Sequence, residues 1–350
     1  MKKIVIVGGG TLGHIYPILP VVKETIDKYE YYFIGTKSGL ERSLIEKSDM
    51  FKDKFFLNMQ GFKRKISIYN LKTIALFLKA YKKGKIILKN INPNLVIGMG
   101  GYISGVIIYA AKKAKYKAII HEQNTVLGLA NRFVEKKVDA VFLNFPIERK
   151  IKNSIIIGNP RLTEVYKNYR KKEVKRHLLI VGGSRGSKII NDTVIKAIEK
   201  LTTLDYKLTL ITGTRYYEEN EKKLLSLNSD RVSIIPFTNN LITYLQKASV
   251  VVSRSGATTL AELIGLRKVT ILIPSPNVTN NHQEKNADQL VKNNCAMKIS
   301  ESKLSVESLT EAIIRLETDL DLRSDYIVNM RRYFNYESLE SFVEEMEKLL

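Results

Sequence analysis

Two glycine-rich turns, one near the start of each half of the chain, constrain the fold more than any other feature. The first joins an apolar run, Ile4–Val7, to the segment Gly8–His14, and the second joins Leu178–Val181 to Gly182–Ser187. A buried parallel strand that turns into a helix has this pattern, and the first amides of such a helix can bind an anion. Because glycine lets a ligand approach the backbone closely, the turns predict two α/β domains that face one phosphate-bearing ligand.

Strand-like and helix-like segments alternate along the chain, which predicts two parallel sheets with right-handed crossovers. The predicted strands are 3–7, 31–34, 95–97, 118–121, 140–143, 155–157, 178–181, 207–211, 232–235, 250–253 and 270–273. The corner Gly158–Pro160 and the charged stretch after it indicate a domain junction. We therefore predict an α/β fold with one domain over residues 1–160, a second over 161–336, and a last helix, 337–350, that returns to the first.

The composition fits a reducing compartment. The 350 residues include one cysteine, Cys295, so no internal disulfide can form. The apolar run after Met1 is too short for a signal sequence, and no run approaches the roughly 20 residues that span a bilayer. We therefore expect a cytoplasmic chain.

The net charge of +22 allows two interpretations. Lysine is abundant throughout, so many lysines can serve only to solvate the surface. Between Asp53 and Glu122, however, there is no acidic residue, whereas fourteen Lys or Arg residues occur there. Such segregation favours an anionic partner, either nucleic acid or a membrane.

The segment 62–90 combines this charge with an amphipathic helix. Its apolar face consists of Leu71, Ile74, Ala75 and Leu78, widened by Phe77 and Tyr81. The basic residues around it are Lys63, Arg64, Lys65, Lys72, Lys79, Lys82, Lys83, Lys85 and Lys89. Most amphipathic helices pack on their own domain, but each lysine near such a face adds about 1 kcal/mol to the binding of anionic lipid. With Phe77 beside the stripe, the pattern favours a helix that lies on an anionic membrane.

The first turn matches the dinucleotide-binding pattern G-x-G-x-x-G through Gly8, Gly10 and Gly13. An NAD site also needs an acidic residue at the tip of the second strand, where it binds ribose hydroxyls. Here that strand ends Phe33–Lys37 without one. The turn therefore serves a ligand other than NAD, and an oxidoreductase is disfavoured.

His14 directly follows the first turn, at the carboxyl end of a predicted strand. A neutral imidazole there can take a proton from an attacking sugar hydroxyl, because histidine titrates near neutrality. The alternative is a structural contact at the start of the next helix. Two more turns of the same half, Gly98–Gly105 and His121–Asn124, also follow strands, where ligands gather in open α/β sheets.

Polar residues of the second half suit a nucleotide sugar. Glu262 lies in a helix that begins after the segment Ser253–Gly256, and it either interacts with the helix dipole or accepts hydrogen bonds from a ribose diol. The loop with Asn280–Gln283 suits sugar hydroxyls and equally a turn. The four histidines are far apart and Cys295 has no partner, so the sequence predicts no metal site.

Taken in order, these segments resemble the MurG-type N-acetylglucosaminyltransferases of bacterial cell-wall synthesis. The matching segments are Gly9–His14, His121–Asn124, Gly158–Pro160, Gly182–Gly186, Arg254–Glu262 and Gln283–Ala287. The resemblance implies a GT-B fold, in which two Rossmann-like domains face a cleft, the first binding the acceptor and the second the donor. It also implies an inverting transfer of N-acetylglucosamine from UDP-N-acetylglucosamine to lipid I, which gives lipid II. The enzyme would need no metal or other cofactor and would act peripherally, on the cytoplasmic side of the cell membrane.

The resemblance also implies roles for particular residues. Near the donor sugar and diphosphate it places Thr11, Leu12, Gly13 and Asn124. Ser184, Ala257, Thr258 and Thr259 would contact the phosphates, Thr238 the uracil, Glu262 the ribose, and His282 and Gln283 the sugar hydroxyls. Leu12 replaces a glycine of the family pattern. Some members carry a donor-site arginine where Leu162 stands here, with Arg161 one position earlier.

The predicted reaction is sugar transfer to the muramyl 4-hydroxyl, with His14 as the base and the amides of Gly182–Gly186 stabilising the departing UDP. A GT-B transferase with another lipid or small-molecule acceptor is the nearest alternative. A nucleic-acid-binding protein would account for the charge but not for the paired turns or Glu262. No nucleic-acid partner is therefore expected.

Overall fold

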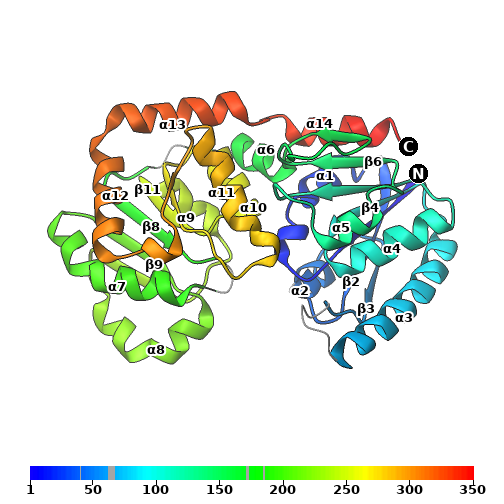
Figure 1. The fold of residues 1–350 in the computed structure, drawn as a ribbon, viewed down its shortest axis with the longest axis horizontal. Coiled ribbons are helices and arrows are strands. Elements are labelled where there is room, and N and C mark those ends of the chain that lie inside the picture. Colours follow the sequence, from blue (N-terminus) through cyan, green and yellow to red (C-terminus); the bar gives the residue numbers. More distant parts are fainter. Residues whose placement is uncertain (40, 62–67, 171–172, 184–185) are drawn as a thin grey trace. The chain divides into compact units, whose positions relative to one another are not determined.

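The computed structural model describes residues 1–350 except 40, 62–67, 171–172 and 184–185. The chain divides into two compact units: unit 1 comprises Met1–Arg161 and Glu337–Leu350, and unit 2 comprises Leu162–Tyr336. The division lies one residue beyond the predicted junction, and the last helix belongs to unit 1. Each unit contains one parallel sheet with helices around it (Figure 1).

Unit 1 is built on a seven-stranded sheet in the order β3-β2-β1-β4-β5-β6-β7. Its strands are β1 (Lys2–Gly8), β2 (Tyr29–Thr36), β3 (Asp53–Leu57), β4 (Leu95–Gly100), β5 (Ala118–Glu122), β6 (Ala140–Leu143) and β7 (Ser154–Ile156). Its helices are α1 (Leu19–Thr25), α2 (Glu41–Glu46), α3 (Ile68–Ile91), α4 (Tyr102–Lys113), α5 (Leu129–Val134) and α14 (Ser338–Glu347), with the 3-10 helix η1 (Leu12–His14). Helix α6 (Pro160–Lys167) spans the division between the units.

Alternate side chains of the central strand β1 face the two sides of this sheet. Val5 and Val7 belong to a core cluster shared with α3 and α4, whereas Ile4 and Ile6 belong to a cluster shared with α1 and α14. All four side chains are fully buried. A parallel strand covered by helices on both faces is expected to be continuously apolar, which is why the sequence reveals these strands so clearly.

Helix α14 completes the core of unit 1. Its Phe342 is fully buried, and the ring centroid lies 5.1 Å from that of Phe142 in β6 and 5.6 Å from that of His121 in β5. At the start of the helix, Ser338 Oγ donates a hydrogen bond to the carbonyl oxygen of Asn159 (2.6 Å). The last helix therefore packs directly behind a residue of the polar segment His121–Asn124.

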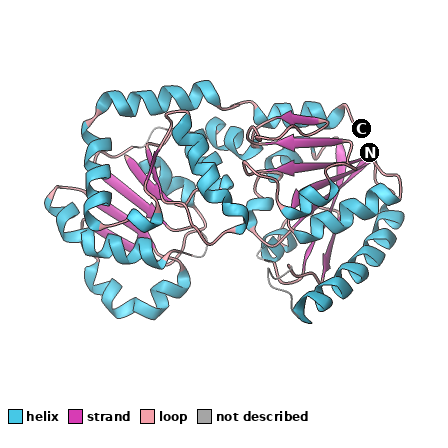
Figure 2. Ribbon diagram, in the orientation of Figure 1, coloured by secondary structure: helices cyan, strands magenta, loops and turns pink. Residues whose placement is uncertain are grey.

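Unit 2 is built on a six-stranded sheet in the order β10-β9-β8-β11-β12-β13. Figure 2 shows the strands of each unit in magenta and the helices around them in cyan. Its strands are β8 (His177–Val181), β9 (Lys207–Ile211), β10 (Val232–Ile235), β11 (Val250–Ser253), β12 (Thr270–Leu272) and β13 (Met297–Lys298). Its helices are α7 (Lys188–Thr203), α8 (Thr214–Leu227), α9 (Leu241–Lys247), α10 (Ala257–Gly265), α11 (His282–Lys292), α12 (Val306–Thr318) and α13 (Leu320–Tyr333), with the 3-10 helices η2 (Thr279–Asn281) and η3 (Glu301–Lys303). Apolar side chains of α7 and α12 form one core cluster with this sheet.

Every predicted strand overlaps an observed strand, and the predicted α/β fold with two parallel sheets is confirmed. The sequence did not indicate β3 or β13. The first four residues of β3 are at least partly exposed, and β13 has only two residues, so neither produces a continuous apolar run. Among the helices of the described residues, none combines the length and the hydropathy required to cross a bilayer.

Candidate functional site

The loops after β1, β4 and β5 come together at the carboxyl edge of the unit 1 sheet. Strand β4 pairs with both β1 and β5, so these three loops are neighbours. Gly100 and Gly101 adopt φ values of 111° and 81°. A Cβ at Gly100 would lie 2.6 Å from His14 Nδ1, and one at Gly101 would lie 2.1 Å from the Gly9 carbonyl oxygen. Glycine at these positions therefore lets the loop after β4 contact the loop that carries His14.

The side chain of Gln123 determines which nitrogen of His14 carries a proton. Gln123 Nε2 donates to the carbonyl oxygen of Met99 (3.0 Å), which can only accept, so Gln123 Oε1 must be the atom that faces His14 Nδ1 at 3.2 Å. An amide oxygen can only accept, and Nδ1 is therefore the protonated nitrogen of a neutral His14. The lone pair lies on Nε2, which is the state that a general base requires.

Gln123 also contacts His121, which extends this network into the core. Gln123 Nε2 lies 3.3 Å from His121 Nδ1, and His121 Nε2 lies 3.2 Å from the carbonyl oxygen of Gly158. The two contacts agree on one neutral tautomer, in which Nδ1 accepts and Nε2 donates. His121 is fully buried, and this burial lowers its pKa to about 4. His121 is therefore a neutral support of Gln123 near pH 7.

The burial of His121 predicts a loss of stability in acid. An unfolded histidine titrates near pH 6.5, whereas the pKa of folded His121 is about 4, so between these values the unfolded chain binds a proton that the folded chain does not. The free energy of unfolding should fall as the pH decreases through this window, by up to about 3 kcal/mol. Urea unfolding at several pH values measures the effect. His121→Gln should show a shallower dependence than the parent, and equal slopes would contradict the prediction.

The first glycine-rich turn does not lead directly into an α-helix as predicted. It enters η1, and α1 begins only at Leu19. Glu41 of α2 also occupies one amide of the turn. Its Oε2 accepts from Gly10 N (3.1 Å), and its Oε1 accepts from the backbone nitrogen and the hydroxyl of Thr36 (3.0 and 2.6 Å). The Gly10 amide already donates to this buried carboxylate, so it is not available to a bound anion. At Gly10, the prediction that the turn offers its amides to an anion is therefore wrong.

A second buried carboxylate, Glu122, organises the loop after β5. Its Oε1 accepts from the backbone and side-chain nitrogens of Asn124 (3.1 and 3.0 Å), and its Oε2 accepts from Gly128 N (2.8 Å) and Asn131 Nδ2 (2.9 Å). Asn124, a predicted sugar contact, is thus held on Glu122. Glu41 and Glu122 were not among the predicted site residues. Both are acidic residues within a few positions of the end of a strand, and this position is the sequence feature that could have indicated them.

The other predicted residues of unit 1 lie at or near the first turn. Thr11 is exposed, and Leu12 and Gly13 are half-buried within η1. The guanidinium carbon of Arg161 lies 5.4 Å from the ring centroid of Tyr16. Arg161, although distant in sequence, is therefore brought to the segment that follows His14.

The turn after β8 has the strand–turn–helix geometry that the sequence predicted. Gly183 and Gly186 have φ values of 86° and 72°, and Gly186 N donates to the Gly183 carbonyl oxygen (2.9 Å). A Cβ at Gly186 would lie 2.0 Å from the Thr212 carbonyl oxygen. Helix α7 begins directly afterwards, so its positive end lies at the turn. Ser184, the predicted phosphate contact, lies outside the described residues.

Arg254 connects three loops of unit 2. Its guanidinium donates to Ser187 Oγ (2.6 Å) and to the Ile273 carbonyl oxygen (3.0 Å), and it forms an ion pair with Glu301. Arg254 belongs to a segment that carries the family resemblance, Arg254–Glu262, but the sequence predicted no role for it. Its contacts hold the start of α7 against the end of β12, so it supports the turn after β8.

Helix α10 carries the residues predicted to bind the nucleotide. Ala257, Thr258 and Thr259 form its first turn, and its N-cap residue, Gly256, has no side chain that could cap these amides. Glu262 lies further along the helix and is 6% exposed. The positive end of α10 therefore follows β11 in the same way that the positive end of α7 follows β8.

His282 and Gln283 are held by backbone contacts at the start of α11. His282 Nδ1 lies 2.8 Å from the Thr279 carbonyl oxygen, to which it donates. Gln283 Oε1 accepts from Ser275 N (2.9 Å). These contacts stabilise the loop after β12, and a role with sugar hydroxyls stays a prediction for both side chains.

Thr238 lies in the loop between β10 and α9, where its Oγ1 accepts from Asn240 N (3.1 Å). The preceding residue, Phe237, is 49% exposed. An exposed aromatic ring beside the predicted uracil contact provides a face on which a base can stack. Phe237 was not among the predicted site residues. Its position two residues after the end of β10 could have indicated it from the sequence.

Family models and solved structures match both units. Residues 4–143 match the glycosyltransferase family 28 N-terminal domain, and residues 177–327 match the glycosyltransferase family 28 C-terminal domain. A crystal structure of Acinetobacter baumannii MurG superposes on this chain with a TM-score of 0.79 and 22% identity. The match covers 99% of this chain and 100% of the MurG chain. This likeness shows a shared GT-B fold. A UDP-N-acetylglucosamine 2-epimerase from Listeria monocytogenes shares the fold at a TM-score of 0.73 and 13% identity, covering 99% of this chain and 96% of its own.

Curated proteins found by sequence have higher identity with this chain than these solved structures have. Two carry the name UDP-N-acetylglucosamine–N-acetylmuramyl-(pentapeptide) pyrophosphoryl-undecaprenol N-acetylglucosamine transferase. The protein from Bacillus pumilus is 42% identical over 332 residues, with 89% of each chain covered. The protein from Bacillus subtilis is 40% identical over 334 residues, with 90% of each chain covered.

Proposed function

The chain belongs to glycosyltransferase family 28, and from its identity with named relatives we infer that it is a MurG-type N-acetylglucosaminyltransferase of peptidoglycan synthesis. It transfers N-acetylglucosamine from UDP-N-acetylglucosamine to the muramyl 4-hydroxyl of lipid I, which gives lipid II. The observation that carries this conclusion is the identity of 42% and 40% with two such transferases over 89% and 90% of the chain. The match spans both units, which favours the same acceptor over another lipid or small molecule.

His14 is the proposed base of the reaction. Its Nε2 takes the proton of the 4-hydroxyl while that oxygen attacks the anomeric carbon of the donor, with inversion. The bond from the anomeric carbon to the diphosphate breaks, and UDP leaves with the electron pair. The hydrogen bond from Nδ1 to Gln123 supports this role. The carboxylates of Glu41 and Glu122 are weaker candidates for the base, because their oxygens already accept hydrogen bonds from the protein. An imidazole, rather than either carboxylate, is thus the proton acceptor at this edge.

Unit 2 is the proposed donor-binding unit. The amides of Gly182–Gly186 and the positive ends of α7 and α10 stabilise the departing diphosphate, so the proposed transfer needs no metal ion. In this proposal Glu262 binds the ribose, the backbone at Thr238 and the ring of Phe237 bind the uracil, and His282 and Gln283 bind sugar hydroxyls. Arg254 supports the geometry by bonding to Ser187 at the start of α7.

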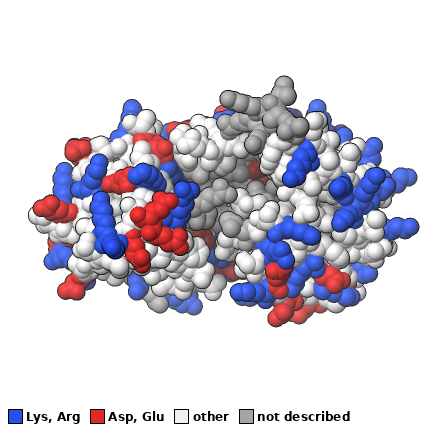
Figure 3. Space-filling model, turned by 90° about the horizontal axis from the view of Figure 1, so that it is seen from below, with Lys and Arg blue, Asp and Glu red and all other residues white. Residues whose placement is uncertain are grey.

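Peripheral binding to the cytoplasmic face of the membrane is proposed through α3. Leu71, Ile74 and Leu78 are 65%, 47% and 54% exposed, although apolar side chains are ordinarily buried. Figure 3, which views the molecule from below, also has many lysine and arginine side chains over unit 1, at the right. An exposed apolar stripe among lysines suits an anionic lipid surface.

Two aromatic residues of the predicted stripe have another role. Phe77 and Tyr81 pack within unit 1, with ring centroids 6.1 Å from Phe133 and 5.8 Å from Tyr109. Lys63, Arg64 and Lys65 lie outside the described residues. The membrane proposal therefore depends on Leu71, Ile74 and Leu78 rather than on Phe77.

Transfer of labelled sugar tests the function directly. Purified protein is incubated with lipid I and radiolabelled UDP-N-acetylglucosamine, with EDTA present throughout. We expect label in lipid II and release of UDP. Absence of transfer under all metal conditions would overturn the proposed activity, whereas loss on chelation that added Mg²⁺ restores would overturn only the metal-independent mechanism.

A further inference from the structure

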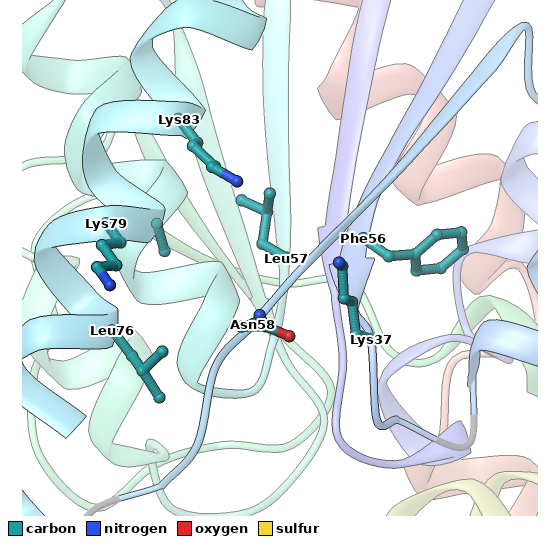
Figure 4. Close-up of a pocket in the computed structure, with 8 residues that line it drawn as sticks. Lys37, Phe56, Leu57, Asn58, Leu76, Lys79 and Lys83 are labelled. Atoms are coloured by element: carbon teal, nitrogen blue, oxygen red, sulfur yellow. The ribbon is translucent and has the colours of Figure 1, made fainter. Parts of the chain in front are cut away.

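A pocket with a volume of ≈ 120 Å³ lies beside α3 in unit 1 (Figure 4). It is lined by Lys37, which follows β2, by Phe56, Leu57 and Asn58 at the end of β3, and by Leu76, Lys79, Ala80 and Lys83 of α3. Lys79 and Lys83 are four residues apart and therefore lie one turn apart on the same side of the helix. The volume is several times that needed for a water molecule, so the pocket can hold a larger polar group.

The charge in this pocket is uncompensated by the residues that line it. Three lysines and one asparagine supply its polar groups, and none of the lining residues is acidic. Some lysines elsewhere in unit 1 have an acidic partner, such as Lys52 with Glu30 and Lys112 with Asp139, each at 2.8 Å. Like charges around one small space repel each other, and an anion bound there would relieve that repulsion.

The apolar part of the lining indicates what kind of anion fits. Leu57 and Ala80 are buried and Leu76 is half-buried, so one wall of the pocket is hydrophobic. The same helix presents the exposed side chains of Leu71 and Leu78. A ligand that joins a phosphate to an apolar chain would use both features, whereas a free phosphate would use only the lysines.

We propose that this pocket binds the phosphate of an anionic glycerophospholipid headgroup, while the acyl chains lie against the exposed apolar side chains of α3. The lysine ammonium groups and the Asn58 amide donate hydrogen bonds to the phosphate oxygens. The proposal rests on the proposed membrane association and deepens it: the membrane is held by a discrete headgroup site as well as by general surface charge.

Two double variants of α3 separate a site from general charge. Lys79→Gln/Lys83→Gln removes two charges from the pocket, and Lys85→Gln/Lys89→Gln removes two charges, also four residues apart, that do not line it. Binding is measured by co-sedimentation with phosphatidylcholine vesicles that contain phosphatidylglycerol. We expect the pocket variant to lose about tenfold more affinity than the control, because charge-assisted hydrogen bonds are lost in addition to surface attraction. Equal losses would overturn the proposal.

Soluble ligands identify the source of the phosphate. Calorimetric titration with monomeric dihexanoyl-phosphatidylglycerol should show binding to the parent and the control variant but not to the pocket variant. Competition by inorganic phosphate at equal concentration would contradict a lipid site. A raised KM of the pocket variant for a short-chain lipid I, with vesicle binding like that of the control, would assign the pocket to the acceptor diphosphate and overturn the proposal. The binding measurements need no activity, so their failure is separate from failure of the transferase assignment.

Discussion

Replacement of His14 by alanine is expected to lower kcat by about 10²–10⁴-fold, the usual contribution of a general base. The dissociation constant for UDP-N-acetylglucosamine should change little, because most of the proposed donor contacts lie in unit 2 and all of them are unchanged in this variant. Rapid-quench measurement of labelled lipid II, together with calorimetric titration of the donor, checks both quantities. A small side chain also leaves room for added imidazole, which should restore part of the rate with a pH dependence of its own.

The matched control for His14 is His282→Ala, which removes an imidazole from unit 2. It should affect the KM for the donor more than kcat, because the proposed role of His282 is to bind sugar hydroxyls. A kcat for His14→Ala close to that of the parent would remove His14 from the mechanism. A loss of donor binding as large as the loss of kcat would instead make His14 a donor contact.

Replacement of Gln123 by glutamate is expected to lower kcat about 10- to 100-fold and to change the pH profile. A carboxylate cannot donate to the Met99 carbonyl oxygen or to His121, so the network that fixes the tautomer of His14 is lost. A negative charge beside His14 also stabilises the protonated imidazolium, which cannot act as a base. The rise of kcat/KM on the acid side of the profile should therefore move to higher pH by about one to two pH units.

Gln60→Glu provides a control of the same chemistry in the same unit. Gln60 Nε2 donates to Thr73 Oγ1 (2.8 Å) and to the Tyr69 carbonyl oxygen (3.3 Å), so this change also places a carboxylate where a donor was needed. It should lower the midpoint of thermal unfolding but leave the pH profile unchanged. If the Gln123 variant loses stability while its profile stays in place, Gln123 is a structural residue only.

The sequence predicted the strands and the two α/β units because burial on both faces makes a parallel strand continuously apolar. Ile4–Val7 is followed by Gly10 and Leu178–Val181 by Gly183 and Gly186, three positions whose positive φ values favour glycine. These are local properties of the chain. The edge strand β3, in which four of the five residues are at least partly exposed, has no such pattern, and the sequence did not predict it.

Local periodicity also failed to distinguish between the two sides of α3. Leu71, Ile74 and Leu78 form the more hydrophobic stripe, yet the helix buries the side that carries Thr73 and Ala80. Small side chains allow close packing against the rest of unit 1, whereas a hydrophobic stripe indicates burial of some kind without specifying whether protein or lipid provides it.

The sequence alone thus determined the fold class, the family resemblance, and His14 as the candidate base, since each is expressed in contiguous segments. Three contacts became known only from the folded structure: Gln123 lies between His14 and His121, Glu41 accepts from the Gly10 amide, and α14 packs behind His121. The physical reason is that hydrogen-bond partners are chosen by distance and direction in space. A contact between residues as far apart as His14 and Gln123 leaves no periodic trace in the chain between them.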